Sequence, residues 1–257
     1  MYLPTEGRPR LLVTMGDPAG IGPEVVLKAC AIRKLSERFN IRVVGRRCRL
    51  DQWSALLGIP LEVELVDPME DAAEATAFSP GVSTPEGARE ALACIKAAAE
   101  MCLSGAADAI VTAPVSKIAM TECGIDFPGH TEYLARLMRT SEYVMTFVVA
   151  GKRVALATTH LSVADVPHAI TRALVLEKIT ILDRGLREWF EVEDPRIAVT
   201  ALNPHAGEDG MFGSEEATAI TPAIADAVAM GIRAEGPFPA DSIYCGFSGD
   251  EFTGACF

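Results

Sequence analysis

The sequence predicts an α/β protein of two domains, in which mixed but mostly parallel sheets are flanked by helices. Three observations support this fold class. Short apolar runs typical of buried strands alternate with helical patterns through the first half of the chain, as in parallel sheets. In the second half, two strand-like runs are separated by a hairpin-length loop, so this pair must be antiparallel. Apolar residues make up 49% of the 257 residues, enough for a substantial core.

The first domain is assigned to residues 1–128. Its expected strands are residues 11–14, 41–44, 61–66 and 108–112. Its first helix begins around Pro23, because proline is favoured in the first turn of a helix. The apolar side chains expected to form the buried face of that helix are Val25, Ala29, Ile32 and Leu35. A second helix is expected from the N-cap Thr84 to Leu103.

The second domain is assigned to residues 129–257. Its hairpin joins the strand-like runs 143–149 and 153–158, and the sheet resumes at residues 197–202. Thr171 caps a long helix between them. The apolar stripe of that helix is Val175, Ile179, Leu182, Leu186 and Phe190. Residues 252–257 are strand-like and end the sequence without a polar tail, so a truncated chain is expected.

Charge and cysteine usage exclude several classes of protein. A net charge of -12 disfavours a nucleic-acid or anionic-membrane binder, which needs a basic face. The basic cluster at residues 42–49 is expected to be a solvated face at a strand end. The seven cysteines are scattered and never closely paired, which indicates a reducing compartment rather than a disulfide framework. Since neither a signal peptide nor a membrane-length apolar run is visible, the predicted location is the cytoplasm.

Two histidines follow strand-like runs in the second domain. His205 comes after the run 197–202 and before a helix opening at Ser214, and His160 comes after the run 153–158. In parallel sheets, ligands bind at the carboxyl ends of strands. Neutral imidazole is a common ligand for zinc and similar ions, although isolated histidines are more often hydrogen-bonded loop residues. Asp241 is a candidate third ligand or a residue that orients one, and His168 is expected to be exposed.

Three motifs of the first half of the chain are candidates for binding an anionic substrate. MGDPAGIGPE at residues 15–24 lacks the third glycine of the dinucleotide fingerprint, so it is either a structural turn or a loop that contacts ligand through Asp17. TAPVSK at residues 112–117 offers Lys117 as a charge partner, or is an ordinary loop with an exposed lysine. FPGHTE at residues 127–132 offers His130 and Thr131 as hydrogen-bond donors, or is a simple helix cap.

Taken together, six motifs resemble the 4-hydroxythreonine-4-phosphate dehydrogenase (PdxA-like) family of pyridoxine biosynthesis. They are MGDPAGIGPE, TAPVSK, GIDFPGHTE, ALATTHLSVADV, LNPHAGEDGMFGSEE and GPFPADS, in the family's order and at its spacing. The match covers nearly the whole chain. The resemblance implies a fold like that of isocitrate and isopropylmalate dehydrogenases, with the active site between two domains. It also implies a homodimer whose subunits share each metal site.

The resemblance implies NAD- or NADP-dependent oxidation and decarboxylation of a phosphorylated 3-hydroxy acid such as 4-phosphooxy-L-threonine, in pyridoxal phosphate biosynthesis. His160 and His205 would be ligands for zinc, cobalt, magnesium or manganese. His130 and Thr131 would contact substrate. We assign catalytic roles to Lys117 and to Asp241, which we expect to orient His130 or a metal ligand. The family's third histidine ligand lies in a segment beyond residue 257, so this sequence is expected to lack it.

Other functions use the same residues. Relatives within the family act on D-threonate or D-erythronate 4-phosphate, or on a cyclohexadiene diol dicarboxylate. A metal-dependent hydrolase, from a different class, would activate water with the same two histidines and with carboxylates such as Glu208, Asp209 and Asp241. A non-catalytic fragment or binding protein is the third interpretation, because the strand-like end leaves the fold incomplete.

Overall fold

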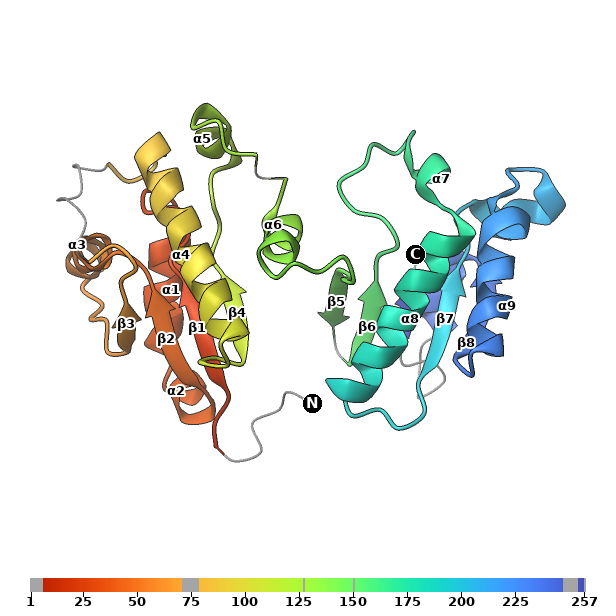
Figure 1. Cartoon of the computed structure of the whole chain (residues 1–257), viewed down its shortest axis with the longest axis horizontal. Coiled ribbons are helices and arrows are strands. Elements are labelled where there is room, and N and C mark those ends of the chain that lie inside the picture. The colour runs from red at the N-terminus through yellow and green to blue at the C-terminus, as the bar shows by residue number, and fades with distance from the viewer. Residues whose placement is uncertain (1–6, 71–78, 127, 150, 247–253, 257) are drawn as a thin grey trace. The chain divides into compact units, whose positions relative to one another are not determined.

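The chain folds into two compact units, Tyr2–Ser141 and Glu142–Phe257 (Figure 1). The computed structural model describes residues 7–70, 79–126, 128–149, 151–246 and 254–256, with side chains described no further than residue 243. The sequence places the domain boundary near residue 128, whereas residues up to 141 group with the first unit. Each unit contains one sheet with helices packed against it, and the sheets are mostly parallel. The predicted α/β fold class is therefore confirmed.

The sheet of the first unit is entirely parallel, with the strand order β3-β2-β1-β4. Thr14, at the end of β1, pairs with Val44 on one side and with Thr112 on the other. The loops that follow these three strands therefore all start at the carboxyl ends of the parallel strands, on the same side of the sheet. The strand bounds are β1 Arg10–Thr14, β2 Asn40–Val44, β3 Glu64–Val66 and β4 Ala109–Thr112.

Helix α2 packs against β2 of the first sheet, and α4 packs against β1, β2 and β4 (Figure 1). The predicted cap of this helix is confirmed, because the Thr84 hydroxyl accepts a hydrogen bond from the Gly87 amide at 3.1 Å. Ala91, Cys94, Ile95 and Ala98 form its buried face. The helix bounds are α1 Gly22–Cys30, α2 Arg33–Arg38, α3 Arg47–Leu57, α4 Pro85–Leu103, α5 Lys117–Glu122 and α6 His130–Leu137.

The predicted buried face of the first helix is wrong. Val25 and Ile32 are 48% and 51% exposed, whereas Val26 and Leu27 are buried. The expected stripe assumed one continuous helix, but α1 ends at Cys30 and α2 begins after a break. Gly22 lets the first turn of α1 pack closely against the end of β1, because a Cβ on Gly22 would lie only 2.3 Å from the Met15 carbonyl oxygen.

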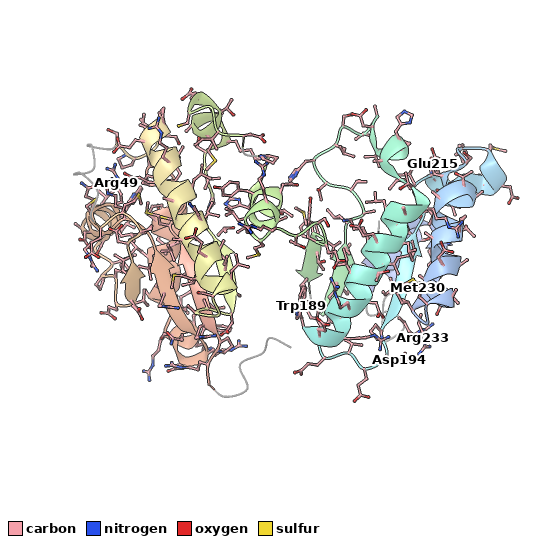
Figure 2. The ribbon with its side chains drawn as sticks, viewed as in Figure 1. Arg49, Trp189, Asp194, Glu215, Met230 and Arg233 are labelled. Carbon is pink, nitrogen blue, oxygen red and sulfur yellow. The ribbon has the colours of Figure 1, made fainter. Side chains whose placement is uncertain are left out.

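The basic cluster at residues 42–49 is not the solvated face that the sequence predicts. Arg46 and Arg49 are 7% and 2% exposed, and both guanidinium groups donate to Glu90 of α4, which is 2% exposed. The three N–O distances are 2.9, 3.1 and 3.1 Å. Figure 2 labels Arg49 at α3. Burial is tolerated here because α4 brings a carboxylate to the two arginines.

The sheet of the second unit is mixed, with the strand order β5-β6-β9-β7-β8. The predicted hairpin is confirmed, because β5 and β6 pair antiparallel with Phe147 opposite Val154. The remaining pairs are parallel, and β9 lies between β6 and β7. The bounds are β5 Thr146–Val149, β6 Lys152–Ala155, β7 Arg196–Thr200, β8 Arg233–Phe238 and β9 Gly254–Cys256.

The predicted stripe of the long helix α8 is confirmed for its helical positions. Val175, Ile179, Leu182 and Leu186 are buried in the core of the second unit, and Phe190 lies just beyond the helix and packs against the same core. The Thr171 hydroxyl caps the helix by accepting from the Leu174 amide at 3.2 Å. The helical bounds are α7 Val166–Ala169, α8 Arg172–Glu188, η1 Pro204–Gly210, η2 Glu216–Ile220, α9 Thr221–Ala229 and α10 Ala240–Gly246.

No helix among the described residues has both the length and the apolar composition needed to cross a lipid bilayer. The cysteines whose side chains are described are free thiols, namely Cys30, Cys48, Cys94, Cys102 and Cys123.

Candidate functional site

Two of the predicted motifs meet at the carboxyl edge of the first sheet. The loop after β1 contacts the loop after β4, where the Asp17 amide donates to the Pro114 carbonyl at 2.9 Å. Gly16 permits this approach, since its φ is +74° and a Cβ there would lie 2.3 Å from the Pro114 oxygen. The close contact explains why a glycine precedes Asp17.

Asp17 is buried inside its own loop. Its side chain is 4% exposed, and its Oδ1 accepts from the Ala19 amide at 2.9 Å. Its Oδ2 accepts a hydrogen bond from the Ser83 hydroxyl. The Trp53 indole donates to the carbonyl of the next residue, Pro18, at 2.7 Å. The carboxylate therefore stabilises the loop, and the predicted contact between Asp17 and substrate stays a prediction.

Lys117 and His130, which come from different motifs, lie close together in the first unit. The Lys117 ammonium donates to the Pro128 carbonyl at 2.8 Å, which ties the start of α5 to the turn before α6. Lys117 is exposed, while His130 and the adjacent Thr131 are half-buried at the start of α6. Two motifs that are separate in the sequence thus contribute to one group of polar side chains.

Burial lowers the pKa of the His130 imidazole, and the positive charge of Lys117 lowers it further. A hydrogen bond with the Ala113 backbone acts in the opposite direction but does not reverse the shift. The lowered pKa favours the uncharged ring at neutral pH. The single N–H of the neutral ring is engaged with the Ala113 backbone, and its other nitrogen is an acceptor. The permanent charge of Lys117 and the positive end of the α6 helix dipole lie beside the ring.

His205 lies in a backbone turn of unusual hand after β7. Every residue from His205 to Asp209 has a left-handed conformation, and His205 itself has φ 52° and ψ 30°. Left-handed conformations are unfavourable for residues other than glycine and often mark functional sites. The His205 side chain is exposed, and its ring centroid lies 6.3 Å from that of Phe212.

His160 also has a left-handed backbone conformation. It has φ 57° and lies exposed between β6 and α7, as the strand-end prediction requires. His168 in α7 is exposed as well, in agreement with the sequence. The two candidate ligands thus belong to left-handed turns that follow strands of one sheet.

Asp241 is exposed in the first turn of α10, directly after β8. Since β8 pairs in parallel with β7, it ends at the same edge of the sheet, and the Ala201 amide donates to the Phe238 carbonyl at 2.7 Å. Figure 2 shows this polarity: Asp194 and Arg233 form an ion pair at the amino ends of β7 and β8, and Glu215 lies at the opposite end of the unit.

A cavity of about 180 Å³ lies where these segments converge. Its wall includes close neighbours in sequence of each candidate residue: Thr158 before His160, Leu202 before His205, and Ala240 before Asp241. The remaining lining residues are Val166, Ile170, Val175, Val199, Thr200, Ala201 and Ile220. The second unit therefore has a mostly apolar hollow beside its candidate polar groups.

Two exposed imidazoles suit a divalent transition metal in donor chemistry and in access from solvent. A catalytic zinc site commonly has three protein ligands. In the part of the chain that the structure describes, no group of three His, Cys, Asp or Glu residues is arranged to hold a metal. The described residues therefore contain no complete metal site, and the ligand roles of His160 and His205 stay predictions.

Glu216 is a residue of this region to which the sequence analysis gave no role. Its carboxylate accepts hydrogen bonds from the backbone amides of Leu202 and Asn203 and from the Asn203 side chain. The sequence signal was ambiguous, because Glu216 follows Ser214 and Glu215, and acidic residues are common at helix starts. Its contacts with the segment preceding His205 become visible only in the folded chain.

Comparison with known proteins agrees with these features. The family described as "Pyridoxal phosphate biosynthetic protein PdxA" matches residues 24–254. The chain is 40% identical to the 4-hydroxythreonine-4-phosphate dehydrogenase of Geobacter metallireducens, over 92% of this chain and 74% of the relative. It is 41% identical to the enzyme of the same name from Chromobacterium violaceum, with the same coverage of each.

Solved structures lead to the same family. The crystal structure of 4-hydroxythreonine-4-phosphate dehydrogenase from Klebsiella pneumoniae superposes with a TM-score of 0.86 at 33% identity, covering 96% of this chain and 80% of that one. A terephthalate 1,2-cis-dihydrodiol dehydrogenase from Burkholderia xenovorans shares the fold, with a TM-score of 0.67 at 23% identity over 97% of this chain and 79% of that one. From its sequence and its fold, the chain belongs to the PdxA family of pyridoxal phosphate biosynthetic proteins.

Proposed function

We propose that this chain is a metal-dependent dehydrogenase that oxidises 4-phosphooxy-L-threonine with NAD or NADP, in pyridoxal phosphate biosynthesis. The observation that carries the proposal is its 40% identity, over 92% of its length, to a relative named for that activity. Two exposed histidines in left-handed turns after strands of one sheet support it. So does the paired placement of Lys117 and His130.

In this proposal, His160 and His205 hold a divalent ion through ring nitrogens exposed to solvent. Imidazole suits zinc, cobalt and manganese, and magnesium is the candidate that prefers oxygen ligands. When bound, the ion supplies Lewis-acid polarisation of the substrate hydroxyl. Asp241 has a positioning role: its carboxylate, at the end of the strand next to β7, orients a metal ligand.

Lys117, His130 and Thr131 form the part of the site that binds negative charge. The Lys117 ammonium attracts a phosphate or carboxylate, and the Thr131 hydroxyl donates a hydrogen bond to it. The His130 ring lies beside Lys117 and contacts the same ligand, while its single N–H is shared with the Ala113 backbone. The N-cap Gly129 of α6 makes no side-chain cap hydrogen bond, so the amides of the first turn are not blocked by a cap side chain. The Asp17 amide donates to the Pro114 carbonyl, and this contact holds the loop after β1 against the segment that leads to Lys117.

The proposed reaction has two steps, an oxidation followed by a decarboxylation. In the first, the C3 hydroxyl loses its proton, C3 transfers a hydride to the nicotinamide, and NAD is reduced to NADH. In the second, the resulting 3-keto acid loses carbon dioxide, and the carbon left behind takes up a proton. The cofactor carries the redox chemistry, and the protein binds and orients the reactants.

The direct test is to mix the chain with NAD and 4-phosphooxy-L-threonine and to follow NADH absorbance. D-threonate 4-phosphate, D-erythronate 4-phosphate and a dihydrodiol dicarboxylate are compared under the same conditions. NADH formation fastest with 4-phosphooxy-L-threonine supports the proposal, and a faster reaction with another acid reassigns the substrate. Zinc-stimulated ester hydrolysis without NAD, and with no NADH from any of the four acids, would contradict it.

The proposal includes a homodimer. The edge strand β5 exposes Phe147, Val148 and Val149 at 54%, 55% and 66%, an apolar edge that a monomer would leave open to water. Pairing with a second copy would cover it.

A further inference from the structure

The turn that carries His205 is costly to form. His205, Ala206, Glu208 and Asp209 all have positive φ, and only Gly207 in this run is a glycine. A left-handed helical conformation is unfavourable for each residue that has a Cβ, because the Cβ comes too close to the following carbonyl oxygen. A run of this kind persists only when surrounding contacts stabilise it. Neighbouring residues must therefore hold the turn in place.

Glu216 makes the contacts that stabilise the turn. Its Oε1 accepts from the Leu202 amide at 3.0 Å and from the Asn203 amide at 2.8 Å, and its Oε2 accepts from the Asn203 side chain at 3.0 Å. Glu216 is only 6% exposed, and Leu202 and Asn203 are half-buried, so removal of the acceptor would leave two partly buried amides unpaired. One buried carboxylate thus fixes the two residues at which the chain leaves β7.

The same carboxylate also packs against the turn itself. Gly207 is buried, and a Cβ added there would lie 2.7 Å from Glu216 Oε2. The chain around Glu216 is irregular too: η2 is a π-helical turn in which the Thr221 amide reaches the Glu216 carbonyl. Single π-turns inside helices are frequent at functional sites. The turn and the helix that braces it are both shaped around this one side chain.

We propose that Glu216 is a positioning residue that holds the His205 imidazole ready for a metal ion. By accepting the Leu202 and Asn203 amides and filling the space beside Gly207, it keeps the left-handed turn in the single conformation that presents the ring. This inference rests on the proposed role of His205 as a ligand. It assigns to Glu216 no contact with metal or substrate.

The test uses two substitutions of similar size. Glu216→Gln keeps one carbonyl oxygen, which can still accept both backbone amides, whereas Glu216→Met keeps the bulk but has no oxygen acceptor. We titrate the full chain with Co²⁺ and follow the visible absorbance, which reports both affinity and ligand geometry. Glu216→Met is expected to weaken Co²⁺ binding by roughly tenfold or more, as removal of groups that orient ligands does. Glu216→Gln is expected to retain most of the affinity.

Glu215→Gln is the matched control. Among the described residues, Glu215 accepts a hydrogen bond from the side-chain amide of Asn203, at 2.8 Å, and its substitution leaves the backbone contacts of Glu216 intact. It should keep the wild-type affinity and spectrum. If Glu216→Met does not fold, as judged by circular dichroism without metal, Gly207→Ala decides, because its methyl group displaces the intact carboxylate. Wild-type Co²⁺ affinity and spectrum in Glu216→Met, or in Gly207→Ala where that variant decides, would overturn the inference.

The inference and the proposed function fail in different ways. If His205→Ala binds Co²⁺ as the wild type does, His205 is not a ligand and the metal assignment itself is wrong. If His205→Ala loses binding while Glu216→Met retains it, the ligand stands and the positioning role of Glu216 is rejected.

Discussion

Helix α5 and the segment 123–129 separate Lys117 from His130 in the sequence, yet the charge of Lys117 lowers the pKa of His130. Burial and Lys117 together keep the pKa of His130 below the ordinary value for histidine, which is about 6.5. The folded state therefore binds this proton less readily than the unfolded chain does. The neutral ring contributes its full stability above about pH 6.5, and that contribution is lost as the pH falls through the folded pKa.

Removing the charge of Lys117 should raise the pKa of His130. We expect Lys117→Met to shift the titration midpoint of the His130 ring protons upward, as measured by NMR. The control is Lys34→Met, because Lys34 is exposed on α2 of the same unit. It should leave the midpoint in place. An unchanged midpoint in Lys117→Met would show that the two side chains do not interact as described.

The Glu90 carboxylate compensates the positive charges of two buried arginines, so its loss should lower the free energy of unfolding. Glu90→Gln leaves Arg46 and Arg49 without their shared carboxylate, and breaking a buried ion pair in this way typically costs about 3–5 kcal/mol. The free energy of unfolding is measured in urea. Glu100→Gln on the same helix is the control, because its ion pair with Lys96 is exposed and is expected to contribute less than about 1 kcal/mol. Equal losses in the two variants would contradict the buried network.

The burial and hydrogen-bond partners of individual side chains were the features least predictable from the sequence. The arginines of the basic cluster were expected in solvent, because their partner Glu90 lies about forty positions away and no local pattern links them. Glu216 received no role for the same reason. The stabilising role of the Glu216 carboxylate becomes visible only when its hydrogen-bond donors, the amides of Leu202 and Asn203, are located in the structure.

At the scale of elements, local signals were more reliable. Thr84 and Thr171 were predicted as helix caps, and both hydroxyls accept the expected amide hydrogen bond. The stripe of α8 was correct because its four-residue and three-residue spacing runs through one unbroken helix. The stripe of the first helix was wrong because the chain breaks between α1 and α2, and a break without proline or glycine gives no clear sequence signal.

The cap of α8 offers a simple test of element stability. Thr171→Ala removes the acceptor of the Leu174 amide and should cost about 1 kcal/mol in the free energy of unfolding. Thr171→Ser retains a hydroxyl at the same position and should restore most of it. If the alanine and serine variants are equally stable in urea, the hydroxyl does not cap the helix.

The exposed edge of β5 tests the proposed homodimer. Val148→Lys places a charge on the apolar edge strand and should shift the chain toward monomer in sedimentation experiments. Val163 is 89% exposed in the loop before α7, outside every strand, so Val163→Lys is the control. A dimer that survives Val148→Lys unchanged would place the interface elsewhere, and a monomeric wild type would reject this part of the proposal.

At the scale of the whole molecule, the α/β class and the mixed character of the second sheet could be predicted because strand-like runs and a hairpin-length loop are local patterns. Strand order could not, because the central place of β9 depends on pairing between distant segments. The candidate histidines were found from their positions after strands. Their left-handed backbone was not foreseen, since residues other than glycine carry no sequence signal for positive φ.

Metal removal tests the central claim most directly. The chain is stripped with a chelator, and NADH formation from 4-phosphooxy-L-threonine is measured before and after resupply of zinc, cobalt, manganese or magnesium. We predict that the stripped chain forms no NADH, and that at least one ion restores the reaction in the wild type but not in His160→Ala or His205→Ala. Undiminished NADH formation by the stripped chain, or by both histidine variants, would contradict a metal-dependent dehydrogenase built on these two residues.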